Sequence, residues 1–440
     1  MLKIWSRGIS TSRVMSAPKH VGGKSKVKQG FKGNSSAKEK VKKSGMTHLK
    51  FKDAVRELKF EKFASKVELP ILKSESTNGD VVKYSKTVKS KLEQLGSFKK
   101  YQHHEAFEEP ISLVSNNLIN LKTEFFKNFG KDSNKFILKG EHRVGKSTLL
   151  TQIQALSKTQ FPQVLYLHFS DVGKIRDGSN DYIFNKRLGL YQQPMFTKRF
   201  INDFRIANKE VLKTIKLSKD IKFTANKVHY DYKAGENTLY EFLRNCKDFN
   251  LKEATSSFQF FIEELKATSV PKLITIDNFN AVTTKPITEY KTTDFEPTHV
   301  TEFEMGKFIY NLIDNTLVLP NSGILLSESS DYGKSRNLDI GLGADYNAYE
   351  LNALDSITIE TLLKGKINVF QVENFNKAET SKLLEFYNKC GVLQLRDYVY
   401  NQRLPTQVEQ GIDLSQLIEL NYVKSGGNPG LLFRHVALNY

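Results

Sequence analysis

Cysteine is scarce in this sequence: its 440 residues contain only Cys246 and Cys390, which lie far apart in the chain. Their spacing matches no metal site, and two cysteines are too few for the disulfide framework of a small secreted domain. We expect both thiols to be buried in the core of a protein from a reducing compartment. The sequence also lacks an apolar run long enough to cross a bilayer, so no membrane insertion is expected.

Acidic residues are nearly absent from positions 1–52, where Glu39 stands against fourteen lysines and arginines. The net charge of this segment is +13, whereas the whole chain has a net charge of +18. Most of the excess positive charge therefore lies in an N-terminal arm, and the remaining 388 residues carry only +5. At this chain length, we expect two folded parts in addition to the arm.

Positions 1–17 have the composition of a mitochondrial transit peptide, because they combine three cations and several serines with no acidic residue. The sequence Arg7-Gly8-Ile9-Ser10 resembles a cleavage site for a matrix protease. These features predict import into the mitochondrial matrix. A basic tail on a cytosolic protein is the alternative.

Residues 18–100 are expected to form a basic N-terminal extension that is partly disordered. Its portion 19–52 is rich in lysine, glycine and serine and has too few apolar residues to fold alone. Blocks of positive charge often bind nucleic acid, and lysines that neutralise phosphates bind any RNA in a salt-dependent way. This pattern predicts an RNA contact, with a solvated tail as the alternative.

The most informative stretch begins with the apolar residues 136–138 and continues through a glycine-bounded loop into a helical pattern. The loop matches G-x-x-x-x-G-K-[ST], the signature of a phosphate-binding P-loop. The expected nucleotide contacts are Gly140, Glu141, His142, Arg143, Val144, Gly145, Lys146, Ser147 and Thr148.

Each part of this loop has a chemical role. The two glycines allow the tight turn that points successive backbone N–H groups at phosphate oxygens. Lys146 places an ammonium beside the β- and γ-phosphates, and the Ser147 hydroxyl is a magnesium ligand. Many P-loops have a further glycine at the position of Arg143, so we expect this loop to be stiffer or differently aimed.

Four further apolar runs, at 164–169, 273–276, 323–327 and 366–372, predict buried parallel strands. With the P-loop strand, they indicate an α/β P-loop NTPase fold of the AAA+ or switch-ATPase type, in which helices cover both faces of a parallel sheet. The expected domains are a nucleotide-binding domain at 101–345 with an insertion at about 170–236, and a mainly helical C-terminal subdomain at 346–440.

Asp277 follows the second of these runs and is the expected Walker B carboxylate, which would hold Mg²⁺ through water opposite Ser147. ATPases with an extra strand between the P-loop strand and the Walker B strand usually place glutamate next, to polarise the attacking water. Here the next residue is Asn278, whose amide cannot act as a base, so slow turnover or none is expected. Ser327 ends the third run and is a candidate sensor of the γ-phosphate, with an ordinary strand-end serine as the alternative.

Three other residues are candidates for nucleotide contact. Pro110 and Ile111 precede the P-loop strand, where related folds place the base, and we expect them to pack against a purine. The G-N-P-G segment at 427–430 resembles the start of a lid helix in switch ATPases. In that interpretation Arg434 would reach the nucleotide, and a surface arginine is the alternative.

The segment Asn376-Lys377-Ala378-Glu379 imitates the N-K-x-D motif that reads guanine in small GTPases. Its fourth residue is glutamate, and an asparagine followed three residues later by glutamate is typical of a capping box. We therefore predict the start of a helix that reaches Cys390.

The chain resembles the death-associated protein three family, whose members are GTP-binding components of the small subunit of the mitochondrial ribosome. The resemblance extends from about residue 111 to residue 440. It rests on the P-loop, Tyr191-Gln192-Gln193-Pro194, the Asp277 strand without a following glutamate, and the terminal segment 428–435. The lysine-rich arm and the long spacing between the P-loop and Asp277 are similar to those of fungal members.

This resemblance implies a structural role in mitochondrial translation, with GTP or GDP and Mg²⁺ bound and little or no hydrolysis; ATP is left open. It implies contacts with small-subunit ribosomal RNA and ribosomal proteins in the matrix, and with the large subunit through intersubunit bridges. The alternative function is an active ATPase or GTPase switch of the same fold, which a turnover assay on the purified protein would reveal.

Overall fold

The computed structural model of the chain describes residues 68–99, 107, 109–131, 134–225, 228–245, 254–344, 354–390 and 414–438. All of these residues lie within one compact unit that spans 62–440. The predictions of a transit peptide at 1–17 and of an RNA contact at 19–52 lie outside the described residues, as does Cys246. None of the helices in the described ranges has the length and apolar character needed to span a bilayer.

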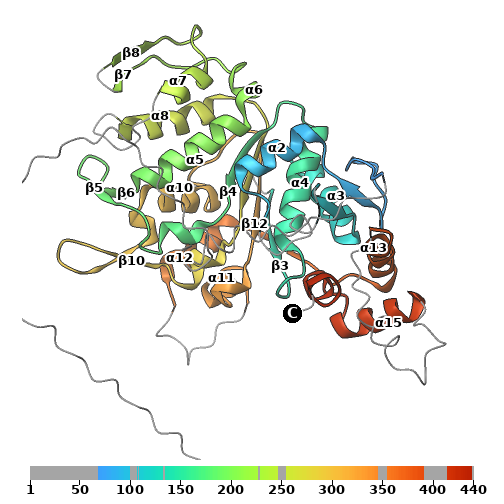
Figure 1. Cartoon of the computed structure of the whole chain (residues 1–440). Helices are drawn as coiled ribbons and strands as arrows, with labels where there is room; N and C mark the ends of the chain where they lie inside the picture. Colours follow the sequence, from blue (N-terminus) through green and yellow to red (C-terminus); the bar gives the residue numbers. More distant parts are fainter. Residues whose placement is uncertain are drawn as a thin grey trace, which may run out of the picture. The chain divides into compact units, whose positions relative to one another are not determined.

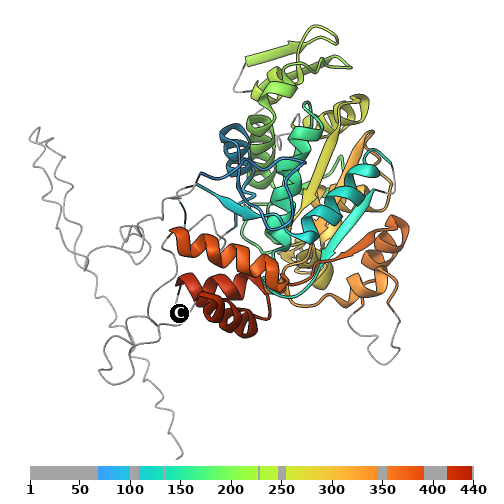
Figure 2. The same ribbon diagram turned by 90° about the vertical axis from the view of Figure 1, so that its right-hand side faces the viewer.

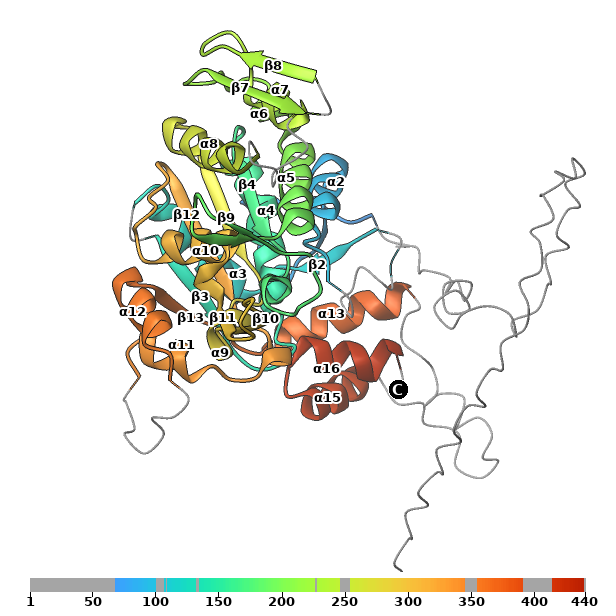
Figure 3. The same ribbon diagram turned by 90° about the vertical axis from the view of Figure 1, so that its left-hand side faces the viewer.

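In the described part of the chain, five parallel strands form the central sheet, in the order β4, β9, β12, β3, β13 (Figure 1 and, with all five strands labelled, Figure 3). Their bounds are Leu165–Phe169 for β4, Lys272–Ile276 for β9, Ser322–Ser327 for β12, Lys135–Lys139 for β3 and Asn368–Gln371 for β13. Strand β12 separates the P-loop strand β3 from β9, the strand that precedes Asp277. This order confirms the predicted α/β P-loop NTPase fold with an extra strand at that position.

Successive side chains of a strand point to opposite faces of the sheet, so the apolar strand residues belong alternately to two clusters. Helices cover both faces and bury these clusters. Phe136 and Leu138 pack in one cluster with α2 (Lys86–Leu95), α3 (Asn116–Lys127) and α4 (Lys146–Gln160). Ile137 packs in the other cluster with α5 (Pro194–Ala207), α8 (Ala254–Ala267) and α10 (Glu304–Ile313). Figure 2 shows the sheet between these two groups of helices. Burial of a large apolar side chain contributes about 1.5–3 kcal/mol, so the strands are held firmly from both sides.

The folded unit begins earlier than the sequence suggested. Strand β1 (Val81–Lys83) pairs antiparallel with β2 (Ile111–Leu113), and Leu92 and Leu95 of α2 are buried. The expected N-terminal extension therefore does not reach residue 100, because residues 68–99 belong to the core. This stretch is polar overall, and its few apolar residues are buried mainly by residues that lie far away in the sequence.

The segment 170–236, expected to be an insertion, contributes to the core as well. Its helix α5 packs against β4 and fills much of one apolar cluster. Two hairpins flank this helix, and its other elements are η3 (Val172–Ile175), β5 (Ile183–Asn185), β6 (Leu190–Gln192), α6 (Lys209–Leu212), β7 (Ile221–Ala225) and β8 (Val228–Tyr232). Helices α7 (Leu239–Asn245) and α8 follow it, and residues 246–253 between them lie outside the described ranges.

Between β9 and β13 lie α9 (Asn280–Thr284), β10 (Ile287–Lys291), β11 (Pro297–His299), η4 (Val300–Glu302), α10, β12, η5 (Ser330–Tyr332), α11 (Arg336–Gly341) and α12 (Ser356–Gly365). Helix α12 packs on α10 and α11, and β13 joins the main sheet. The separate helical group therefore begins after β13 and not at residue 346, because the short run before it completes the sheet edge.

The described part of this C-terminal group contains α13 (Lys377–Cys390), α15 (Leu414–Ser425) and α16 (Pro429–Phe433), which Figure 3 labels, and the π-helix η7 (Arg434–Leu438). The predicted capping box at the start of α13 is confirmed. The Asn376 Oδ1 atom accepts from the Glu379 backbone N–H at 2.8 Å, and the Asn376 N–H donates to Glu379 Oε2 at 3.0 Å. Cys390 is buried at the end of this helix, as expected.

Candidate nucleotide-binding site

The P-loop joins β3 to α4 at the carboxyl edge of the parallel sheet, where ligands bind in open α/β folds. Glycine is required at position 140, because a Cβ atom there would lie 2.7 Å from the carbonyl oxygen of Val372. Gly145 is the N-cap of α4 with φ +103°, and Arg143 has φ +63°. Arg143 therefore adopts the left-handed conformation that glycine favours, which accounts for the glycine of other P-loops at this position.

Lys146 lies inside the loop and is only 7% exposed. Its Nζ atom donates to the carbonyl oxygens of Gly140 and Glu141, both at 2.7 Å. Burial lowers the pKa of Lys146, and the negative charges of Glu328, Asp277 and Glu141 partly offset this effect. A bound phosphate would offer this ammonium a charged acceptor in place of two carbonyls, which strengthens the hydrogen bond.

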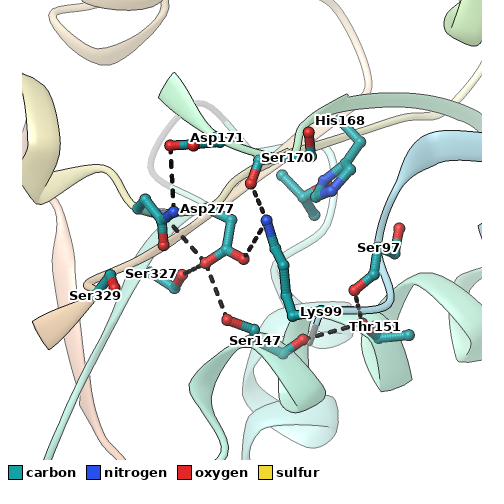
Figure 4. Close-up of polar contacts among 12 residues, drawn as sticks. Ser97, Lys99, Ser147, Thr151, His168, Ser170, Asp171, Asp277, Ser327 and Ser329 are labelled. Carbon is teal, nitrogen blue, oxygen red and sulfur yellow. Dashed lines mark hydrogen bonds and ion pairs between the residues drawn. The ribbon is translucent and has the colours of Figure 1, made fainter. Parts of the chain in front are cut away.

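Asp277 is 1% exposed and collects hydrogen bonds from several elements (Figure 4). Its Oδ1 atom accepts from the Ser147 hydroxyl at 3.2 Å, from the Asn278 backbone N–H at 3.1 Å and from the Ser327 hydroxyl. The two predicted magnesium ligands thus lie in direct contact. The Ser327 hydroxyl points to Asp277, and its contact with a γ-phosphate stays a prediction.

The donor atoms of Ser147 and Asp277 match the ligand chemistry of Mg²⁺. A hydroxyl and one carboxylate are the oxygen ligands that Mg²⁺ uses together with phosphate oxygens. Among the residues that the structure describes, no group of three or more His, Cys, Asp or Glu side chains could hold a metal ion. Ser147 and Asp277 therefore fit a magnesium ion that a nucleotide brings with it.

Lys99 is a charged member of the site that the sequence did not reveal. Its Nζ atom lies 3.3 Å from Asp277 Oδ2 and also donates to the carbonyl oxygen of Ser170 (Figure 4). Lys99 lies in no recognisable motif, and no sequence signal connects it with Asp277. The nearby His168 is neutral, since burial and the Lys99 charge lower its pKa to about 3.

Asn278 occupies the place where many ATPases have a glutamate. Its backbone has φ +58°, and its Nδ2 atom donates to Asp171 Oδ1 at 3.2 Å. The Tyr332 hydroxyl donates to the same Asp171 oxygen at 3.2 Å. Asparagine tolerates a left-handed backbone better than glutamate, so local geometry as well as chemistry favours Asn278.

Glu328 follows Ser327 and is a second carboxyl group near the P-loop that the sequence did not indicate. Its Oε1 atom lies 3.8 Å from Lys139 Nζ. Burial raises the pKa of Glu328, and the Lys139 and Lys146 charges act in the opposite direction. The negative charge of this carboxylate opposes the lowering of the Lys146 pKa by burial.

The C-terminal segment contacts the P-loop backbone, but through residues other than Arg434. Asn428 Nδ2 donates to the His142 carbonyl oxygen at 2.9 Å, and the Gly430 N–H donates to the Arg143 carbonyl oxygen at 3.2 Å. A Cβ atom on Gly430 would lie only 2.4 Å from the Arg143 Cβ. Arg434 is exposed, and its contact with a nucleotide stays a prediction.

Pro110 and Ile111 are both buried at the start of β2. Ile111 packs in the apolar cluster of the C-terminal helices. Strand β2 is fixed to the P-loop helix, because Gln152 Nε2 donates to the Leu113 carbonyl oxygen at 2.8 Å. Contact of Pro110 and Ile111 with a purine base stays a prediction.

The segment Tyr191-Gln192-Gln193-Pro194 lies at the junction of β6 and α5 and has a structural role. Gln193 Nε2 donates to the Ile175 carbonyl oxygen at 2.8 Å, and Gln192 Nε2 donates to Glu304 Oε2 at 2.9 Å. Burial raises the pKa of Glu304 to about 7, although its hydrogen bonds to Gln192 and Gln259 lower it. These two glutamines satisfy polar groups inside the core.

A family model described as "Mitochondrial ribosomal death-associated protein 3" matches residues 112–435. Two proteins named "Small ribosomal subunit protein mS29" are similar to the chain. The Neurospora crassa protein is 21% identical over 341 residues, covering 72% of this chain and 69% of that protein. The Schizosaccharomyces pombe protein is 24% identical over 371 residues, covering 82% of this chain and 71% of that protein.

Among solved structures, that of Cdc6p from Pyrobaculum aerophilum is 12% identical and covers 63% of this chain and 48% of its own. The TM-score is 0.29, which is too low to support an argument. The assignment of the fold therefore rests on the strand order of the central sheet. The family match rests on residues 112–435, which include the P-loop, Asp277, Ser327 and the segment that contacts the P-loop backbone.

Proposed function

Because the chain belongs to the mitochondrial ribosomal death-associated protein 3 family, we propose that it is a structural component of the small subunit of the mitochondrial ribosome. The observation that carries this proposal is the family match over residues 112–435, together with two relatives that bear the name of a small ribosomal subunit protein. The chain contributes to mitochondrial translation as part of that particle.

The protein retains a purine nucleotide, GTP or GDP, with Mg²⁺ at the P-loop. The buried Lys146 ammonium and the contact between Ser147 and Asp277 support this part of the proposal. The nucleotide would lie where the carboxyl ends of β3, β9 and β12 meet and where the C-terminal segment contacts the loop. Its role is to fix that segment in place.

Turnover of the nucleotide is slow or absent. Asn278 offers an amide where a general base is needed, and its backbone conformation disfavours glutamate. The presence of Ser147 and Asp277 favours a second candidate function, an active ATPase or GTPase switch of the same fold. A turnover measurement on the purified chain distinguishes the two functions.

The N-terminal arm directs the protein to its particle. Residues 1–17 direct import into the mitochondrial matrix, and residues 19–52 contact small-subunit ribosomal RNA. Ribosomal proteins of the small subunit are further partners, and the large subunit is reached through intersubunit bridges. The charge of +13 in the first 52 residues supports the RNA contact.

The test is sedimentation of a tagged chain in mitochondrial extract across a salt series. The full chain should sediment with the small subunit. Deletion of residues 20–45 should leave an imported, nucleotide-bound protein that joins the subunit less well and leaves it at lower salt. If the deletion variant co-sediments with the small subunit as the full chain does at every salt concentration, the arm does not contribute to binding. A full chain that stays in the cytosol would overturn the ribosomal function. Extraction of the nucleotide from the particle would identify the base.

A further inference from the structure

Asp277 has both of its carboxylate oxygens engaged by the chain itself. The Oδ1 atom accepts from Ser147, Asn278 and Ser327, while the Oδ2 atom lies 3.3 Å from the Lys99 ammonium. In a P-loop NTPase the corresponding carboxylate is the protein's negative charge for magnesium. Here a lysine already neutralises it.

We infer that Lys99 is a built-in counter-ion for Asp277 and that it replaces much of the contribution of Mg²⁺ to nucleotide binding. This inference rests on the proposed nucleotide binding and deepens it. A divalent cation gains little from a carboxylate that is already paired with an ammonium, and the two cations repel each other. The nucleotide should therefore bind almost equally well with and without Mg²⁺.

The backbone around Lys99 is fixed by the P-loop helix. Ser97 is 3% exposed, and its carbonyl oxygen accepts from the Thr151 hydroxyl at 3.0 Å. The same hydroxyl contacts the Ser147 carbonyl oxygen at 3.0 Å. The backbone beside Lys99 is thus hydrogen-bonded to α4, the helix that carries the predicted magnesium ligand Ser147. This attachment holds the long Lys99 side chain close to Asp277.

Asp277 is the charged partner of the Lys99 ammonium, and the two other groups beside this ammonium are uncharged. Ser170 offers a carbonyl oxygen, and His168 is buried and hydrogen-bonded to the Thr275 hydroxyl at 2.8 Å. Neither group competes with Asp277 for the positive charge. The Asp277 side chain is 2% exposed and the Lys99 side chain is 26% exposed, so solvent screens this ion pair less than a pair on the surface.

The experiment measures the dissociation constant of a methylanthraniloyl-labelled GTP for the full chain, in excess Mg²⁺ and in excess EDTA. In the wild type the two constants should differ by less than about threefold, whereas in Lys99→Ala they should differ by about tenfold or more. Lys91→Ala is the matched control, since Lys91 lies in the same N-terminal segment and forms an ion pair with Glu210 at 2.8 Å. This control should behave as the wild type.

A second measurement does not need the nucleotide. Removal of Lys99 leaves the buried Asp277 carboxylate without its ion-pair partner, so Mg²⁺ alone should raise the unfolding temperature of Lys99→Ala and not that of the wild type. A wild type that already depends strongly on Mg²⁺, or a Lys99→Ala variant that gains no dependence in either assay, would overturn the inference. If no variant binds the labelled GTP, the proposed nucleotide function fails, and the unfolding temperatures still decide the role of Lys99.

Discussion

The phosphate side of the candidate site and its carboxylate side are built in different ways. The phosphate side consists of consecutive residues, Gly140 to Thr148, which form the loop after β3 and the first turn of α4. The carboxylate side is assembled from Lys99, Asp277 and Ser327, which come from separate segments and meet only because the parallel strands end at one edge. The first kind of site is visible as a motif, and the second is visible only in the fold.

The two sides also differ in how closely they follow the pattern of an active NTPase. The phosphate side has its glycines, its buried Lys146 and its hydroxyl. The carboxylate side has Asn278 where a base is expected and Lys99 where a bound cation would contribute. This difference predicts that nucleotide retention and nucleotide turnover are separable in this chain, and three substitutions test the two sides of the site.

The largest effect is expected from Lys146→Ala on the phosphate side. The substitution removes an ammonium that faces two phosphates in a partly dry site, which we expect to cost about 3 kcal/mol, or about 100-fold in nucleotide affinity. The measurement is the amount of nucleotide that co-purifies with the protein. Lys158→Ala, on the same helix but at its far end, is the control and should retain the nucleotide. If both variants retain equal amounts of nucleotide, the P-loop is not the nucleotide-binding site.

Local features of this molecule could be predicted from the sequence. The P-loop and the capping box of Asn376 and Glu379 depend on residues within one turn or loop, and both lie where their patterns indicate. The strands of the central sheet could be predicted from apolar runs of suitable length, whereas their order in the sheet is given by the structure. Interactions over long distances in the chain could not be predicted in this way, because nothing near Lys99 indicates that its partner is Asp277.

The C-terminal segment shows the same limit. The sequence pointed to the correct segment and to Arg434, whereas the contacts with the P-loop are made by Asn428 and by the backbone of Gly430. The contact at Gly430 depends on the absence of a side chain. Such a role becomes visible only when the opposing backbone, here that of Arg143, is in place.

An intermediate effect is expected from Gly430→Ala, which tests whether the C-terminal segment belongs to the phosphate side. The new Cβ would lie 2.4 Å from the Arg143 Cβ, so the segment or the loop must move. Overpacking of this kind costs about 1–3 kcal/mol, and we expect about a tenfold loss of nucleotide affinity. Titration with labelled GTP measures this loss. Val423→Ala, at a position 77% exposed on α15, is the control. If both variants bind as the wild type does, the segment is not part of the site.

The smallest effect is expected from Asn278→Glu on the carboxylate side. In an ATPase whose other catalytic parts are in place, a glutamate at this position should raise the rate of hydrolysis, because its carboxylate can act as a base. The structure gives two reasons why it should not. Position 278 has φ +58°, where a non-glycine residue other than asparagine or aspartate is disfavoured by about 1–2 kcal/mol. A glutamate would also lose the donor that faces Asp171 and place a second carboxylate beside it.

We therefore expect Asn278→Glu to lower the stability by about 1–2 kcal/mol and to leave turnover below about one per second, as in the wild type. Denaturant unfolding and phosphate release from the purified chain measure the two quantities. Asn278→Gly separates the effects, because glycine accepts the positive φ but loses the donor to Asp171 and supplies no base, so it should be more stable than Asn278→Glu and stay equally slow. A rate of about one per second or faster in the wild type would make the protein an active switch NTPase. The same rate in Asn278→Glu alone would show that a single base is missing and that the Lys99–Asp277 pair does not hinder hydrolysis.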